Sequence, residues 1–81
     1  MHLIFTERFW RSYHRAPPEV QRAFDRRAPM LAADLRHPSL HAKKYDQAQD
    51  IWQARVNKDW RFYFLIQEKA YILLDMMSHP K

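Results

Sequence analysis

The chain has 81 residues, enough for one domain, and it contains no cysteine, which excludes disulfides and cysteine-based zinc sites. Its net charge of +5 lies entirely in residues 1–45, where nine basic residues accompany four acidic ones. A basic surface favours an anionic partner, either nucleic acid or an acidic protein, although a charge of this size can also serve solubility alone. No apolar run is long enough to cross a membrane and no signal-peptide core is visible, so a cytoplasmic protein without a membrane partner is expected.

The N-terminal segment predicts a short strand followed by a helix. Residues 3–5 form a brief apolar run that suits an edge strand. Thr6 follows as a helix N-cap, and Glu7 lies in the first turn, where the helix dipole favours an acid. Phe9, Trp10 and Tyr13 then recur at helical spacing.

A second helix is predicted from Pro18 onward. Pro17 and Pro18 end the first helix and start the next, because proline is tolerated in the first helical turn. One apolar stripe then recurs every three to four residues: Val20, Phe24, Ala28, Leu31 and Leu35. Pro29 interrupts this stripe, so we expect the helix to kink or to split near Ala28.

From residue 51 the apolar period changes to two, which predicts three strands. These strands are residues 51–56, 60–66 and 70–76, joined by three-residue turns at 57–59 and 67–69. The complete order is a short N-terminal strand, a two-helix hairpin and a three-stranded antiparallel meander. This is an α+β fold with the helices packed on one face of the sheet.

The turn lengths predict the strand register. The first turn pairs Arg55 with Arg61 and Gln53 with Tyr63, and the second pairs Arg61 with Asp75. The predicted core face carries Trp52, Ala54, Val56, Trp60, Phe62, Phe64, Ile66, Ile72 and Leu74. The opposite face carries Gln53, Arg55, Arg61, Tyr63, Tyr71 and Asp75, with Leu65 and Leu73 as exposed apolar neighbours and His79 just beyond the last strand.

Arg55 and Arg61 form the first candidate site. Like charges directly opposite one another on paired strands destabilise a sheet, so an anion bound between them is one explanation of the pair. The planar guanidinium suits phosphate better than an ammonium does. The other explanation is structural: Asp75 neutralises one arginine and water solvates the second. On the first explanation, Arg61→Ala abolishes activity and leaves the fold intact.

A second basic cluster precedes the strands and contains His37, His41, Lys43 and Lys44. Histidine is the side chain best matched to proton transfer near neutral pH, whereas the alternative is a solvated loop. His37 and His41 have a spacing that zinc can use. Pro38 lies between them and no third ligand is evident, so a zinc site is not expected.

The order and spacing of these motifs resemble the RelE-type and HigB-type toxins of the RelE/ParE superfamily. The second half of those chains is similar to the segment LRHPSLHAKKYDQAQDIWQARVNKDWRFYFLIQEKAYILLDMMSHPK, and their two-helix hairpin is similar to FWRSYHRAPPEVQRAF. The resemblance covers nearly the whole chain. It implies a single RelE-like domain and the toxin of a type II toxin–antitoxin system. Such a toxin cleaves mRNA on the ribosome without a metal or other cofactor, and an antitoxin holds it inactive.

The resemblance also implies roles for individual residues. Arg55 and Arg61 match a basic residue and a phosphate-binding arginine on neighbouring strands, and His79 matches the terminal residue that acts as acid or base. The expected contacts to RNA and the ribosome are His41, Lys43, Lys44, Gln53, Lys58 and Tyr63. Met77 and Ser78 depart from the HigB-like pattern, in which an acid and a tyrosine precede the terminal histidine.

Two other functions fit the same fold. One is a ParE-like inhibitor of DNA gyrase, which has no need of the clustered Arg55, Arg61 and His79. The other is an RNA-binding module without catalytic activity.

Overall fold

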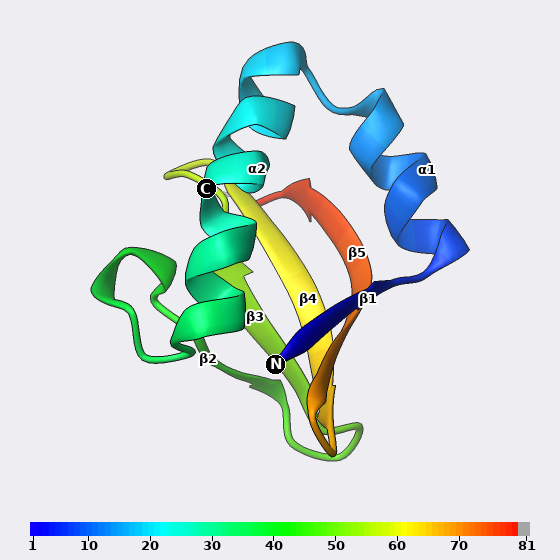
Figure 1. Cartoon of the computed structure of the whole chain (residues 1–81). Coiled ribbons are helices and arrows are strands. Elements are labelled where there is room, and N and C mark those ends of the chain that lie inside the picture. Colours follow the sequence, from blue (N-terminus) through cyan, green and yellow to red (C-terminus); the bar gives the residue numbers. More distant parts are fainter. Residues whose placement is uncertain (80–81) are drawn as a thin grey trace.

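The computed structural model describes residues 1–79 and contains a five-stranded mixed sheet with two helices packed against it (Figure 1). The strand order is β1-β5-β4-β3-β2; β1 runs parallel to β5, and all other neighbours are antiparallel. The elements are β1 (His2–Phe5), α1 (Glu7–Arg15), α2 (Pro18–Ala33), the 3-10 helix η1 (Pro38–Leu40), β2 (Lys43–Asp46), β3 (Ile51–Arg55), β4 (Trp60–Gln67) and β5 (Ala70–Ser78). The predicted α+β order is confirmed.

Thr6 begins α1 and fixes it to the sheet. Its hydroxyl oxygen accepts a hydrogen bond from the Phe9 N–H at 3.1 Å, as an N-cap does, and its O–H donates to the Leu73 carbonyl at 2.8 Å. The Thr6 N–H donates to the same carbonyl at 3.1 Å. The start of α1 is therefore attached to the middle of β5.

The helix α2 runs without a break from Pro18 to Ala33, so of the two effects expected of Pro29 near Ala28, a kink or a split, the split is wrong. Pro29 lies inside the helix and has no N–H to donate to the preceding turn. Phe24 and Leu31 lie on either side of it and are buried in the same core. Tertiary packing therefore maintains the helix across Pro29, as it does for most helices in proteins.

The strand β2 was not predicted, because its sequence KKYD carries no apolar alternation. It pairs antiparallel with β3, with Lys43 opposite Gln53 and Lys44 opposite Trp52. The meander therefore has four strands instead of three. Lys43 and Lys44 consequently lie on opposite faces of an edge strand and not together on a loop.

The predicted register of the first hairpin is confirmed, and that of the second is wrong. Arg55 lies opposite Arg61, as expected. The β4–β5 connection is a two-residue turn, with Glu68 in the left-handed conformation at φ 51° and Gln67 opposite Ala70. This shift reverses the faces at the start of β5. Tyr71 and Leu73, predicted on the outer face, are buried in the core, whereas Ile72 and Leu74 are not part of it.

A β-bulge shifts the pairing once more. Phe64 pairs with Leu73 but Tyr63 pairs with Asp75, which leaves Leu74 as the additional residue. Arg61 therefore lies opposite Met77 and not opposite Asp75 as predicted. The shorter turn and the bulge each shift the pairing by one residue. Because a shift of two residues leaves every side chain on its original face, Asp75 still shares a face with Tyr63, as the pattern predicted.

Aromatic side chains from both helices and the sheet fill the core. Phe24 of α2 meets Phe62 of β4 edge to face, with ring centroids 5.3 Å apart, and Phe9 of α1 lies 5.0 Å from Phe24. The largest fully buried side chains are Phe9, Phe62, Phe64, Leu31, Leu40, Leu73, Met76 and Val56. The helices therefore cover one face and leave the other, here called the outer face, for the candidate site. Within residues 1–79, no helix has the length and apolar character needed to span a lipid bilayer.

Candidate functional site

A pocket of about 460 Å³ on the outer face brings together six of the nine predicted site residues. It lies where β2, β3 and β4 meet the end of β5. We call it the cationic pocket; it is lined by His41, Ala42, Lys43, Gln53, Arg55, Arg61 and His79. No carboxylate is among these lining residues, so the pocket presents positive charge from three separate strands.

Arg61 is held by the main chain of the β3–β4 turn. It is only 7 % exposed, and its Nη1 donates to the carbonyls of Asn57 at 2.9 Å, Trp60 at 3.1 Å and Lys58 at 3.2 Å. A guanidinium has five N–H donors, and within residues 1–79 the three on Nε and Nη2 make no hydrogen bond. The side chain is therefore fixed in place with donors to spare for an anion.

Arg55 lies opposite Arg61 and is half-buried in the same pocket. None of the ion pairs between described residues uses either arginine. Asp75, which the structural explanation assigned to one of them, accepts instead from Arg8 Nε at 3.1 Å. The assignment of Asp75 to one of these arginines is therefore wrong, and no ion pair between described residues neutralises either guanidinium group.

Two histidines stand at the rim of the cationic pocket. The N–H of His79 donates to the Asp59 carbonyl at 2.6 Å, which ties the end of β5 to the β3–β4 turn beside Arg61. His41 ends η1 in the left-handed conformation, at φ 47° and ψ 43°, which directs the chain into β2. His37 lies outside the pocket lining, and its Nδ1 caps η1 by accepting from the Ser39 N–H at 3.1 Å.

Three predicted binding residues do not line the cationic pocket. Lys44 points to the opposite side of β2, where it forms an ion pair with Asp50 and lies 5.2 Å from the ring centroid of Trp52. Lys58 is exposed in the β3–β4 turn. Tyr63 is on the outer face but lines a neighbouring hollow.

This neighbouring hollow, of about 180 Å³, was missed by sequence reasoning. We call it the aromatic hollow; it is lined by Arg8, Tyr45, Ile51, Tyr63, Leu74, Asp75 and Met77. Tyr45 meets Tyr63 edge to face, with ring centroids 4.9 Å apart. Burial raises the pKa of Tyr63, and Tyr45 and Asp75 raise it further against the lowering effect of Arg61. Its phenol therefore keeps its proton at neutral pH. Recognising β2 as a strand would have placed Tyr45 on this face.

Metal ligands do not cluster in the part of the chain that the structure describes. Over residues 1–79, no three histidine, cysteine, aspartate or glutamate side chains gather in a group that could hold a metal ion. The chemistry available in the cationic pocket is that of arginine, lysine and imidazole groups, which can bind a phosphate and transfer protons.

No protein-family model matches the chain, and no curated protein matches it in sequence. Solved structures match it in fold. A YoeB/ParE toxin from Agrobacterium tumefaciens has a TM-score of 0.78 and 14% identity, over 99% of this chain and 100% of that one. The RelBE toxin–antitoxin complex from Mycobacterium tuberculosis matches with a TM-score of 0.79 and 18% sequence identity, over 96% of this chain and 96% of that one. The isolated RelE toxin of E. coli matches with a TM-score of 0.76 and 11% sequence identity, over 99% of this chain and 85% of that one. The chain therefore has the fold of the RelE/ParE-like toxins.

Proposed function

We propose that the chain is the toxin of a type II toxin–antitoxin pair and that it cleaves mRNA on the ribosome. The observation that carries this proposal is the cationic pocket, which gathers Arg55, Arg61, Lys43 and two histidines on one face. The fold supports it, because the chain shares that fold with RelE and YoeB toxins.

The proposed reaction is attack of a ribose 2′-oxygen on the adjacent phosphorus. The P–O5′ bond breaks, leaving a 2′,3′-cyclic phosphate on the upstream fragment and a 5′-hydroxyl on the downstream one. Arg61 and Arg55 stabilise the additional negative charge of the phosphorane, and stabilisation of developing charge is usually the largest catalytic contribution. His79 and His41 flank the arginines in the lining and supply the groups that accept the 2′ proton and protonate the 5′ oxygen.

The pocket also supports an RNA substrate over a small anion. Lys43 is exposed at the edge strand, next to the guanidinium groups, and can contact a second phosphate. The aromatic hollow adjoins the pocket through the pairing of Gln53 with Tyr63, and it offers ring faces and edges to a base. The ribosome then has the role of presenting a single-stranded codon to this face.

We propose an antitoxin as the second partner. Solved structures of the same fold include a RelE–RelB complex from Pyrococcus horikoshii and a YoeB–YefM complex from Staphylococcus aureus. On this chain, the cationic pocket and the aromatic hollow form one mixed surface of arginines beside Tyr45, Ile51 and Met77. An acidic, amphipathic antitoxin segment matches that surface and denies RNA the arginines.

Incubation with programmed ribosomes tests the proposal. Cleavage of the mRNA on ribosomes but not of the same mRNA alone supports it. Intact mRNA combined with inhibition of DNA gyrase supercoiling would establish the ParE-like alternative instead. Titration with the product of a small neighbouring gene then tests the antitoxin: the proposal requires a binder that suppresses cleavage, with association that slows as salt rises.

A further inference from the structure

We propose that Asp75 is a positioning residue whose carboxylate holds the β-bulge that places His79 on the outer face. The position of His79 follows from the structure alone, and only its consequence for catalysis rests on the proposed function. Bulges occur often beside functional sites because they redirect a side chain.

At the bulge, the odd-numbered residues of β5 change from the core face of the sheet to the outer face. Before it, Tyr71 and Leu73 are buried in the core. Strict alternation would keep Met77 and His79 on that same core side. Because Leu74 is an additional residue, Met76 takes the core position opposite Phe62 and is 2 % exposed, whereas Met77 is 42 % exposed. His79 therefore reaches the cationic pocket only because the bulge exists.

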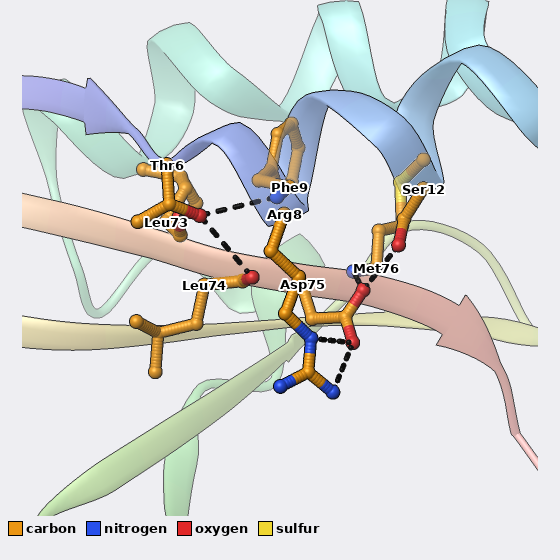
Figure 2. Close-up of polar contacts among 8 residues, drawn as sticks. All are labelled: Thr6, Arg8, Phe9, Ser12, Leu73, Leu74, Asp75 and Met76. Atoms are coloured by element: carbon orange, nitrogen blue, oxygen red, sulfur yellow. Dashed lines mark hydrogen bonds and ion pairs between the residues drawn. The ribbon is translucent and has the colours of Figure 1, made fainter.

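Both oxygens of the Asp75 carboxylate accept hydrogen bonds next to the bulge (Figure 2). It is 8 % exposed, and its Oδ1 accepts from the N–H of Met76 at 2.8 Å and from the hydroxyl of Ser12. Its Oδ2 accepts from Nε of Arg8 at 3.1 Å and pairs with Nη2 of Arg8 at the same distance. A buried main-chain donor at the bulge thus has a side-chain partner, and the same side chain joins the bulge to α1.

The N-cap residue of α1 also forms hydrogen bonds to the strand at the start of the bulge. The Thr6 hydroxyl donates to the Leu73 carbonyl at 2.8 Å and lies 3.3 Å from that of Leu74, while Ser12, six residues along, contacts Asp75. Figure 2 shows both sets of contacts along one side of β5. One helix therefore fixes both the residue before the bulge and the residue after it.

Without the bulge, continuing the pairing of Phe64 with Leu73 would put Met76 opposite Arg61 and Ser78 opposite Asp59. The Asp59 carbonyl, which now accepts from the N–H of His79, would face a different residue. Loss of Asp75 is expected to favour this unbulged pairing, because the Met76 N–H and the Ser12 hydroxyl lose their acceptor. The imidazole of His79 would then leave the pocket.

The test measures the register directly, by cross-strand nuclear Overhauser contacts between β4 and β5. Wild type should show Arg61 adjacent to Met77, and Asp75→Ala should show Arg61 adjacent to Met76. Asp75→Asn, which keeps an acceptor for Met76 and Ser12, should retain the wild-type pairing. Retention of the Arg61–Met77 contact in folded Asp75→Ala would overturn the inference. This measurement does not depend on any activity, so it stands even if the proposed function fails.

A rescue variant separates positioning from general stabilisation. Deleting Leu74 gives the same pairing of Tyr63, Phe62 and Arg61 without any bulge, so Asp75 should become dispensable. On programmed ribosomes, Asp75→Ala should lower kcat about 100-fold with little change in KM, as expected for a misplaced acid or base. Combining Asp75→Ala with deletion of Leu74 should restore most of the loss. If Asp75→Ala does not fold, the combined variant should fold; failure of both to fold would contradict the inference.

Discussion

Arg55 and Arg61 lie directly opposite one another on β3 and β4 and share one pocket, yet among residues 1–79 only Arg61 of the two donates side-chain hydrogen bonds to the main chain. Opposed like charges on paired strands cost stability, and no ion pair between described residues offsets this cost. The two arginines are therefore not equivalent. Arg61 is fixed by hydrogen bonds to the turn, whereas Arg55 forms no ion pair with another described residue.

Replacement of Arg55 should separate activity from stability. Arg55→Ala is expected to lower the cleavage rate about 100-fold, the usual loss for one charge-stabilising donor, and to leave the free energy of unfolding unchanged or slightly higher. Ribosome cleavage and urea denaturation measure the two effects. Arg22→Ala, on the exposed side of α2, removes the same charge and should leave cleavage near wild type. Equal losses in both variants would mean that net charge matters and the pocket does not.

Replacement of Arg61 should affect both properties. The sequence pattern predicts that Arg61→Ala leaves the fold intact, but the structure changes that expectation because Nη1 satisfies three carbonyls of the β3–β4 turn. We expect Arg61→Ala to lower the free energy of unfolding by about 1–3 kcal/mol and to abolish cleavage. Arg61→Lys retains the charge without the planar fork, so it should recover part of the stability and little of the activity. Unchanged unfolding of Arg61→Ala would show that the turn does not need it.

Neighbouring leucines on β5 test the corrected register. Leu73 is fully buried and Leu74 lies at the bulge in the aromatic hollow, the reverse of the sequence prediction. Leu73→Ala should destabilise by about 2–5 kcal/mol and Leu74→Ala by less than half of that. Phe62→Ala, predicted from sequence to be costly, should lose about 3–5 kcal/mol because its ring is fully buried. Chemical denaturation measures all three, and a larger loss in Leu74→Ala than in Leu73→Ala would restore the original register.

Adjacent lysines on β2 form a matched pair for RNA binding. Lys43 lines the cationic pocket, whereas Lys44 points away to Asp50 and Trp52. Lys43→Ala should weaken ribosome binding and reduce the slope of log affinity against log salt by about one, the effect of one lost phosphate contact. Lys44→Ala should leave that slope unchanged. Salt titrations of both variants decide this, and identical slopes would contradict the assignment of Lys43.

Alkaline pH should destabilise the fold through Tyr71. Burial raises its pKa above the ordinary value of 10.0, and the nearby charge of Asp34 raises it further. The folded state therefore holds the phenol proton more tightly than the unfolded state does. This contribution is complete below the unfolded pKa and is lost as pH rises from there through the folded pKa. Denaturation from pH 8 to 11 should show a smaller alkaline loss for Tyr71→Phe than for wild type. Parallel curves would show that Tyr71 makes no such contribution.

The first hairpin and the order of the two helices could be predicted from sequence because the apolar residues recur with a clear period in each, although the pattern did not show that α2 continues through Pro29. Asn57 and Asp59 mark the turn, and polar residues alternate with apolar ones on either side of it, with Gln53 and Arg55 before it and Arg61 after it. The second hairpin could not, because the run AYILLDMM is apolar at both parities and gives no indication of which residues face the core. The strand β2 was hidden for the opposite reason, since KKYD is almost wholly polar.

The candidate site was predicted better than the register that leads to it. His79 falls on the outer face in the prediction and in the structure, because the shorter turn and the bulge together shift the pairing by two residues and preserve its parity. The contacts of Asp75 to Arg8 and Ser12 join residues more than 60 positions apart, so no local pattern indicates them.

The chemistry of the RNA ends tests the central proposal most directly. Wild type and Arg55→Ala are incubated with ribosomes that carry a defined codon in the decoding site, and both fragments are mapped and their termini identified. The proposal predicts one cut within that codon, a 2′,3′-cyclic phosphate upstream, a 5′-hydroxyl downstream, and a rate about 100-fold lower for Arg55→Ala. Intact mRNA with wild type, or a 3′-hydroxyl upstream and equal rates for the two proteins, would contradict it.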